Sequence, residues 1–375
     1  MNIHTHRTKL AAAAGTLAVG AALALAGSAN AAVEYKLTIT DPGPLDANSP
    51  FQQAPWLSIN NLGTPVGSTF STLNDGQGTF ATRGTGLEKL TIGNDVKNRN
   101  HQTVAFDIND GGTAVGTAQQ DTLDTELGLG PERPYLWSAG VSTGTPLNIF
   151  AGKSAQPQAI NNGGDIVGES FPGNGVDGKE FKTTAFELTR TGTLLELPTL
   201  PGGRFAKAAD IDETGTTIVG SSDLSTNINV QHATAWRNGV ASDLGTLPGG
   251  TFSAAVKVNA SGTAVGVSNG TSTGNTATIF AGGQVTSLGA GSPSKASSVN
   301  DGGTVVGWSG TNDGNASGFR FKNGKLENLN TLIAPGSGYT LGVTNSVNNA
   351  GQIVGVAREN AHPSHMVGFI LTPIS

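Results

Sequence analysis

Val258-Asn259-Ala260-Ser261-Gly262-Thr263-Ala264-Val265-Gly266 is one copy of a phrase that recurs along the chain. The phrase is an aliphatic residue, Asn, two variable residues, Gly, two more variable residues and Val-Gly. Seven copies follow one another at intervals of ~40–50 residues, a period typical of repeat architectures. The fourth copy is one residue longer and has Asp for Asn. The motif Asn or Asp occupies these positions: Asn60, Asn109, Asn161, Asp212, Asn259, Asn300 and Asn348.

Each repeat has the pattern of four short strands. In the fifth repeat, apolar residues at strand spacing predict strands over 253–259, 263–268, 276–280 and 284–289. Glycines lie in the predicted turns, and Asn-Gly pairs such as Asn238-Gly239 are typical of tight hairpins. No stretch after residue 31 shows helical periodicity. The chain therefore has the pattern of an all-β protein with about 28 strands.

Seven four-stranded antiparallel units predict a seven-bladed β-propeller, because each unit buries its sheet faces only against its neighbours. The last repeat lacks a fourth strand after Met366–Leu371, and Tyr35–Thr40 is an unassigned strand ahead of the first repeat. We expect this N-terminal strand to complete the last blade. An open β-solenoid is the alternative. We expect residues 32–375 to form a single domain, with repeats beginning near 54, 103, 155, 206, 253, 296 and 342.

Residues 1–31 have the features of a secretory signal peptide. Arg7 and Lys9 precede an apolar run over Leu10–Gly27, and Ala29-Asn30-Ala31 offers a small-residue cleavage site. The run is short of the ~20 residues that a membrane span needs. We therefore expect a secreted, extracellular protein, with the periplasm as the alternative, and no membrane insertion after cleavage.

The composition narrows the classes of function. The chain has 21 Lys and Arg against 27 Asp and Glu, so its net charge is −6, and no basic stripe offers a surface for nucleic acid. It has no Cys, which excludes disulfides and thiolate metal sites. With 55 Gly and 13% charged residues, it suits short strands joined by tight turns. We expect a monomer without a cofactor.

Two stretches resemble a known family. His232-Ala233-Thr234-Ala235-Trp236 is followed by Asp243-Leu244-Gly245-Thr246-Leu247-Pro248-Gly249-Gly250, and Leu197–Gly203 repeats the second half. These stretches resemble the HAF family of bacterial extracellular repeats, although Thr234 stands where that family has Phe. The resemblance covers about residues 54–357. It implies an exported repeat protein, and that family carries no common assigned activity.

Few residues point to catalysis. No nucleophile-elbow motif is present, and His362-x-x-His365 supplies too few ligands for a metal site. The motif Asn and Asp are not spaced as a Ca²⁺ loop, and we expect their side chains to cap their own turns. Asp121, Asp124 or Glu126 could provide the paired carboxylates of a glycosidase. A solvated acidic loop is the simpler interpretation, and Phe171, Tyr135 and Tyr339 could stack on sugars.

Loops between the second and third strands vary in length, whereas the other turns are short. Insertions on one face of a repeat array often mark the binding face. We expect a non-catalytic protein that binds a glycan or an extracellular protein through this face. The alternatives are a carbohydrate-active hydrolase or lyase and a structural component of the surface or matrix. The candidate binding residues are Asp121, Asp124, Glu126, Glu132, Arg133, Phe171, Asp177, His362 and His365.

Overall fold

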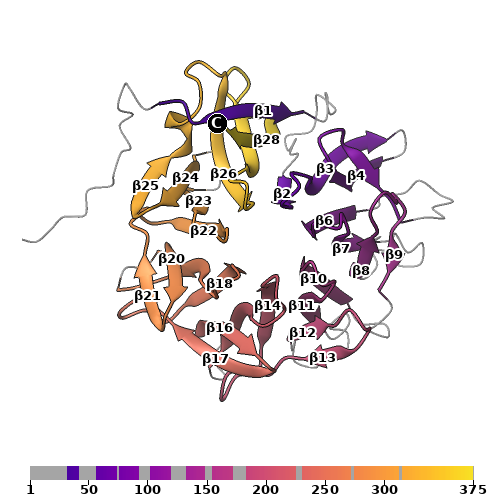
Figure 1. Cartoon of the computed structure of the whole chain (residues 1–375), viewed down its shortest axis with the longest axis vertical. Coiled ribbons are helices and arrows are strands. Elements are labelled where there is room, and N and C mark those ends of the chain that lie inside the picture. The colour runs from indigo at the N-terminus through magenta and orange to yellow at the C-terminus, as the bar shows by residue number, and fades with distance from the viewer. Residues whose placement is uncertain are drawn as a thin grey trace, which may run out of the picture.

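A computed structural model shows a closed ring of seven four-stranded antiparallel sheets (Figure 1). It describes residues 32–41, 56–73, 76–92, 102–119, 132–147, 154–171, 183–224, 230–271, 274–311 and 315–374. The predicted seven-bladed β-propeller is confirmed, and the solenoid alternative is wrong because the last sheet lies beside the first. The predicted signal peptide at residues 1–31 lies outside the described residues.

Blades 1 to 6 each place four consecutive strands from the channel outward. Blade 1 has β2 (Trp56–Ile59), β3 (Pro65–Leu73), β4 (Gly76–Arg83) and β5 (Glu88–Leu90). Blade 2 has β6 (Gln102–Ile108), β7 (Ala114–Gln119), β8 (Glu132–Trp137) and β9 (Thr145–Pro146). Blade 3 has β10 (Ser154–Ile160), β11 (Ile166–Phe171), β12 (Thr184–Leu188) and β13 (Leu194–Glu196).

The later blades repeat this order. Blade 4 has β14 (Ala206–Ile211), β15 (Ile218–Asp223), β16 (Gln231–Arg237) and β17 (Val240–Gly245). Blade 5 has β18 (Ser253–Val258), β19 (Ala264–Ser268), β20 (Thr276–Ala281) and β21 (Gln284–Ser287). Blade 6 has β22 (Ser294–Val299), β23 (Val305–Ser309), β24 (Ser317–Lys322) and β25 (Lys325–Asn328). The only helical element in the described ranges is one 3₁₀ turn, η1 (Leu329–Thr331).

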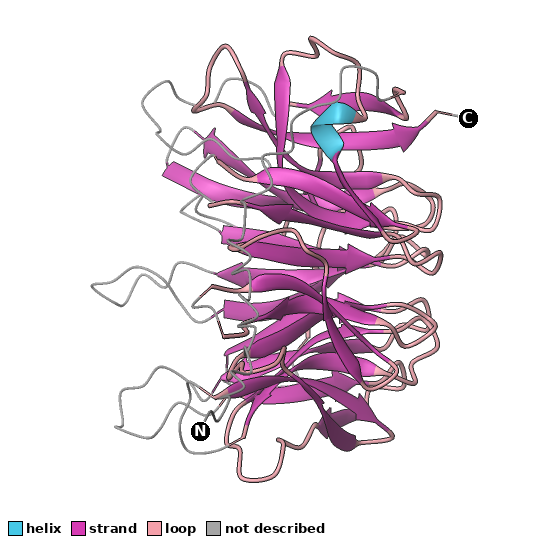
Figure 2. Cartoon of the chain, turned by 90° about the vertical axis from the view of Figure 1, so that its left-hand side faces the viewer, coloured by secondary structure: helices cyan, strands magenta, loops and turns pink. Residues whose placement is uncertain are grey.

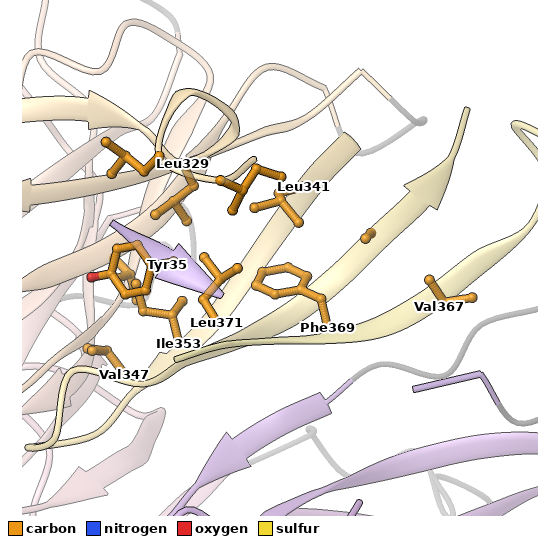
Figure 3. Close-up of a cluster of buried hydrophobic side chains, with 12 residues drawn as sticks. Tyr35, Leu329, Leu341, Val347, Ile353, Val367, Phe369 and Leu371 are labelled. Carbon is orange, nitrogen blue, oxygen red and sulfur yellow. The ribbon is translucent and has the colours of Figure 1, made fainter. Parts of the chain in front are cut away.

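Blade 7 is built from both ends of the chain. β26 (Tyr339–Val347), β27 (Ile353–Glu359) and β28 (Met366–Pro373) are consecutive, and β1 (Tyr35–Thr40) supplies the fourth strand. β1 pairs antiparallel with β28 along its whole length, with Tyr35 opposite Pro373 and Thr40 opposite Gly368. Tyr35 packs in the buried cluster of this blade, near Ile353 and Leu371 (Figure 3). The predicted completion of the last blade by the N-terminal strand is confirmed.

The hydrophobic cores lie between neighbouring blades. One cluster joins Val66 and Leu90 of blade 1 to Ala105 and Trp137 of blade 2. The Trp137 indole also donates 2.8 Å to the carbonyl oxygen of Thr91 in the preceding blade. Because each blade buries its faces against the next, closure of the ring leaves no terminal face exposed.

A β-bulge explains the glycine of each Val-Gly pair. The register of β18 against β19 shifts between Ala255 and Lys257, opposite Gly266. A Cβ on Gly266 would lie 2.0 Å from the carbonyl oxygen of Ala254, so only glycine fits there. The same close approach recurs at Gly116, Gly168, Gly220, Gly307 and Gly355.

The two ends of the ring differ (Figure 2). The turns from first to second strand, which contain the motif Asn, form one end together with the turns from third to fourth strand; we call it the motif-turn face. The connections from second to third strand begin after Leu73, Gln119, Phe171, Asp223, Ser268, Ser309 and Glu359. We call the end where they lie the variable-loop face.

Candidate functional site: the mouth of the central channel

Each first strand contains a β-bulge, which re-aims the side chain of the residue directly after it. This residue lies two positions before the motif Asn or Asp. Around the ring the position is occupied by Ser58, Asp107, Ala159, Asp210, Lys257, Ser298 and Ser346. Five of them line a cavity of about 70 Å³ at the motif-turn face: Ser58, Asp107, Asp210, Lys257 and Ser346. That volume holds a few water molecules or a small ion, but not a sugar ring.

Lys257 links three blades across this mouth. Its ammonium lies 2.8 Å from Oδ1 of Asp210 on blade 4 and 3.9 Å from Oδ2 of Asp107 on blade 2. The other oxygen of Asp210 accepts from the backbone N–H of Val258 at 2.8 Å. Asp210 is therefore a buried carboxylate with both oxygens satisfied, and its charge is balanced by the neighbouring blade.

Asp107 makes the equivalent contact between blades 2 and 3. Its Oδ1 accepts from the Ser58 hydroxyl at 2.5 Å, and its Oδ2 accepts from the N–H of Ile160 at 3.1 Å. A carboxylate at this position thus accepts a hydrogen bond from a backbone N–H of the next blade, as Asp210 also does. The two aspartates join blade 1 to blade 3 and blade 4 to blade 5.

Burial and charge oppose each other at this site. Burial raises the pKa of Asp210 to about 6, although Lys257 acts to lower it. Burial alone would lower the pKa of Lys257, but the charges of Asp107 and Asp210 raise it above its usual value. Lys257 is therefore a permanent cation, and Asp210 is the group whose charge changes near neutral pH.

The motif Asn residues form a ring of hydrogen bonds around the mouth. Each Oδ1 accepts from the backbone N–H four residues later, as Asn259 does from Thr263 at 3.0 Å, so the predicted turn caps are present. Nδ2 reaches the next blade: Asn259 donates to the carbonyl oxygen of Asn300 at 3.0 Å. Asn60, Asn109, Asn300 and Asn348 make the same cross-blade bond.

This ring is interrupted on both sides of blade 4. Asp212 has no amide to donate to blade 5, and its carboxylate instead accepts from Thr214 and Thr216 in its own turn. Asn161 of blade 3 turns its Nδ2 to Asp165, 3.1 Å away. Two of the seven cross-blade amide bonds are therefore replaced by bonds within a turn.

A second ring lies just outside the first. Backbone N–H groups of the residue after the motif Asn donate to the corresponding side chain of the next blade, as Asn61 does to Asp110 at 2.7 Å. Asp110, Asn162, Ala260, Asp301 and Asn349 donate in the same way. The backbone N–H of Glu213 has no such acceptor, because the corresponding residue of blade 5 is Ala260, which has no polar side chain. Both rings are thus interrupted beside blade 4.

The predicted binding residues lie elsewhere. Asp121, Asp124, Glu126 and Asp177 are outside the described residues. Glu132 begins β8 and is followed by the exposed Arg133, whereas Phe171 ends β11 and is half-buried. His362 and His365 lie between β27 and β28. All of these described residues lie toward the variable-loop face, but only the two histidines are brought together.

Glu359 is the residue around which the histidines meet. Its Oε2 lies 2.9 Å from Nδ1 of His365 and 3.3 Å from Nδ1 of His362. Nε2 of His365 faces Asp41, just after β1, at 3.6 Å. These contacts lower the pKa of Glu359, chiefly through the hydrogen bond from His365. Within the described part of the chain, no group of three or more His, Asp or Glu residues is arranged to hold a metal ion.

Asp107, Asp210 and Lys257 were not predicted from the sequence. The sequence does contain a signal for them, since aligning the seven repeats on the motif Asn or Asp puts all three charged residues two positions before it. What the alignment could not show is that the bulge aims this position inward, and that blades 2, 4 and 5 come together through Lys257.

Comparison with solved structures supports the fold. The β-propeller domain of the Trilobed protease from Pyrococcus furiosus has a TM-score of 0.53 at 9% identity, covering 85% of this chain and 92% of that one. That domain has an open velcro topology, whereas here β1 closes the ring. A puromycin-hydrolyzing peptidase from Mycobacterium tuberculosis has a TM-score of 0.53 at 11% identity, covering 90% of this chain and 56% of that one.

A third structure is the acylaminoacyl peptidase from Pyrococcus horikoshii, with a TM-score of 0.50 at 9% identity. The alignment covers 85% of this chain and 51% of the peptidase, so this chain spans about half the length of both peptidases. At these identities the likeness extends to the fold alone.

The remaining comparisons concern sequence and membrane spans. No curated protein sequence matches the chain. In the ranges that the structure describes, no helix has the length and apolar character to cross a membrane. A family model matches residues 21–234, which is more than half of the chain. The chain therefore belongs to the family described as Protein of unknown function (DUF3466).

Proposed function

We propose that this protein is a non-catalytic propeller that binds a glycan or an extracellular protein through its variable-loop face. The supporting observation is the contrast between the two ends of the ring. First and second strands are joined by nearly uniform turns, for example from Ile108 to Ala114 and from Val258 to Ala264. Second and third strands are separated by very different lengths, from Leu73–Gly76 in blade 1 to Gln119–Glu132 in blade 2. The turns from third to fourth strand vary less, from Arg237–Val240 in blade 4 to Trp137–Thr145 in blade 2, so the largest variation lies on one face, which is typical of a binding face.

The channel mouth supports a structural role for the opposite end. Its cavity is about 70 Å³, and the charges of Asp107, Asp210 and Lys257 are already paired with one another or with backbone N–H groups. A sugar could not enter without breaking the contacts that join the blades. The channel mouth therefore holds the ring together and leaves the variable loops free to carry recognition.

Export is part of this proposal. The positive start, apolar run and small-residue site within residues 1–31 are the features of a signal peptide. The resemblance of His232–Gly250 to the HAF repeats, which belong to exported bacterial proteins, favours the same location. We propose a protein that is secreted or held in the periplasm.

Replacing the two longest variable loops tests the proposal. In residues 32–375, residues 120–131 and residues 172–182 are each replaced by Asn-Gly, which can join strands that pair as Gln119 does with Glu132. Leu62→Ser, at a 77% exposed residue on the motif-turn face, is the control. A glycan array and capture of extracellular proteins should show a ligand for the parent and the control. The loop variants should lose it, and unchanged binding by both loop variants would contradict the proposal.

A second experiment separates binding from catalysis. Parent protein is incubated with the glycans that it binds, alongside Asp121→Asn, Asp124→Asn and Glu126→Gln. The proposal expects binding without turnover. Hydrolysis or elimination that any one of these substitutions abolishes would instead establish the carbohydrate-active enzyme.

A further inference from the structure

A second pocket lies on the motif-turn face, between blades 6 and 7. It has a volume of about 430 Å³, within the range of small-ligand sites, and is far larger than the channel mouth. Its walls include Glu34, Arg320, Lys322, Asn349, Pro373 and Ile374. We propose that this groove binds an acidic oligosaccharide, one of whose sugars carries a carboxylate.

The groove exists because blade 7 is completed by the N-terminal strand. The two chain ends meet here: the N–H of Ile374 donates to the carbonyl oxygen of Glu34 at 2.9 Å. The backbone N–H groups of Glu34 and Tyr35 both donate to the carbonyl oxygen of Leu332. One wall is thus the start of β1, held in place by backbone bonds on both sides.

Arg320 makes the inner wall rigid. Its side chain is only 5% exposed, and its Nη1 lies 2.7 Å from Oε2 of Glu34 and 3.2 Å from the Tyr35 hydroxyl. The guanidinium carbon lies 5.5 Å above the Tyr35 ring, and Glu327 binds the other side of the group. This wall is preorganised, because its charged groups are fixed before any ligand arrives.

Lys322 provides the cation that a ligand can use. It ends β24, it is exposed, and it has no carboxylate within 4.0 Å among the described residues. Lys325, three residues later, is by contrast paired with Glu327 at 2.6 Å. An ammonium that lines a groove and is not itself paired with a carboxylate favours a ligand that carries one.

The other walls suit hydroxyl groups and an apolar sugar face. Glu34 is 46% exposed and presents a carboxylate that accepts hydrogen bonds, while Asn349 Nδ2, which donates one hydrogen to Oδ2 of Asp301 at 2.7 Å, has a second hydrogen to offer. Pro373 and the 54% exposed Ile374 offer an apolar surface. A hydroxyl both donates and accepts, so acceptor and donor groups in one groove favour a polyhydroxylated acid over an acidic peptide.

This site is separate from the proposed function, because it lies on the opposite end of the ring from the variable loops. Loss of one activity therefore leaves the other testable. The loop replacements described above should leave the groove ligand bound, and groove variants should leave the loop ligand bound.

Calorimetry on residues 32–375 tests the groove with tri-galacturonate, using maltotriose and tri-glutamate for comparison. Lys322→Glu reverses the free charge, and Gly302→Tyr fills the groove. Gly302 tolerates a side chain, since its Cβ would meet only Asn300 Oδ1, at 3.4 Å. The controls make corresponding changes on other blades of this face. Arg190→Glu reverses an exposed charge on blade 3, and Gly111→Tyr adds the same ring on blade 2, where its Cβ would meet Asn109 Oδ1 at 3.2 Å. Thermal unfolding confirms that each variant is folded.

We expect tri-galacturonate to bind the parent. Lys322→Glu should weaken it about ten-fold or more, the effect of losing one charge-assisted contact. Gly302→Tyr should weaken it at least as much, because its ring occupies the space of the ligand. Arg190→Glu and Gly111→Tyr should leave the affinity within about two-fold of the parent, and maltotriose should bind more weakly. The proposal would be overturned if the parent did not bind tri-galacturonate, or if Lys322→Glu and Gly302→Tyr bound it as tightly as the parent does. Tighter binding of tri-glutamate than of tri-galacturonate would assign the groove to an acidic peptide instead.

Discussion

Asn348 on the last blade donates its Nδ2 to the carbonyl oxygen of Asn60 on the first blade, at 2.9 Å. The two residues are 288 positions apart in the chain, yet the bond is the same as those between consecutive blades. It lies at the channel, whereas β1 pairs with β28 at the outer side of blade 7. The ring is therefore closed twice, by an amide near the axis and by a strand at the rim.

Replacing Asn348 with Asp should weaken the closure. The change removes the donor to Asn60 and the 2.8 Å bond to Gln352 Oε1, and it places a carboxylate against a buried carbonyl oxygen. We expect a loss of about 1–3 kcal/mol in the free energy of unfolding, measured by urea denaturation. Asn360→Asp, an exposed amide whose Oδ1 only accepts from Thr340, is the matched control. An equal effect of both changes would contradict the role of the ring.

Replacing Asp212 with Asn should have the opposite effect. The new amide could keep the turn contacts through its Oδ1 and donate its Nδ2 to the carbonyl oxygen of Asn259, which would fill one gap in the ring. We expect a gain of about 0.5–1.5 kcal/mol, seen as a higher urea midpoint. Asp212→Ala, which removes the bonds to Thr214 and Thr216, should lower the midpoint. A lower midpoint for Asp212→Asn would show that the longer turn of blade 4 prevents the bond.

The glycine of the Val-Gly pair should tolerate no side chain. In Gly266→Ala the new Cβ would lie 2.0 Å from the Ala254 carbonyl oxygen, so the bulged first strand must move. We expect a destabilisation of about 1–3 kcal/mol or more by denaturation. Gly86→Ala is the control, because a Cβ there meets nothing within 4 Å. Similar stability of the two variants would show that the bulge adjusts freely.

The repeated phrase was enough to predict the fold, because each of its parts has a local physical role. The turn Gly residues and the Asn-Gly hairpins are intrinsic to short loops, and Asn238 and Asn323 have the positive φ values that such hairpins need. The missing fourth strand at one end and the extra strand at the other predicted the pairing of β1 with β28. These are properties of neighbouring residues or of the count of strands.

The channel site could not be predicted in the same way. The sequence predicted that the motif Asn caps its own turn, and its Oδ1 does so, but the role of Nδ2 depends on the next blade. The Lys257 contacts with Asp210 and Asp107 depend in addition on which blades face each other across the axis. The three residues share one offset in their repeats, but a shared offset does not say which of the seven side chains at that position touch, and Asp107 lies three blades away from Lys257 along the chain.

Asp210 should make the stability of the ring depend on pH. Its pKa is raised to about 6 in the folded protein, from an ordinary value of 3.8, so the folded state binds the proton more tightly. Its contribution to stability is therefore fully present below about pH 4 and is lost as the pH rises through about 6. Denaturation of the parent and of Asp210→Asn from pH 4 to 7.5 should show the parent losing stability relative to the variant. A constant difference would contradict the raised pKa.

The rim closure should depend on Arg320. Burial alone would lower the pKa of Arg320, but its bonds to Glu34, Glu327 and Tyr35 raise it, so the guanidinium stays charged where it joins β1 to blade 6. Arg320→Met leaves Glu327, 12% exposed, without that partner, and should cost about 3 kcal/mol. Hydrogen exchange should show the β1 amides losing protection before those of β15 in blade 4. Lys325→Met removes a 74% exposed partner of the same Glu327, and should change stability by about 1 kcal/mol or less. If β1 stayed as protected in Arg320→Met as in Lys325→Met, the strand pairing with β28 alone would account for the closure.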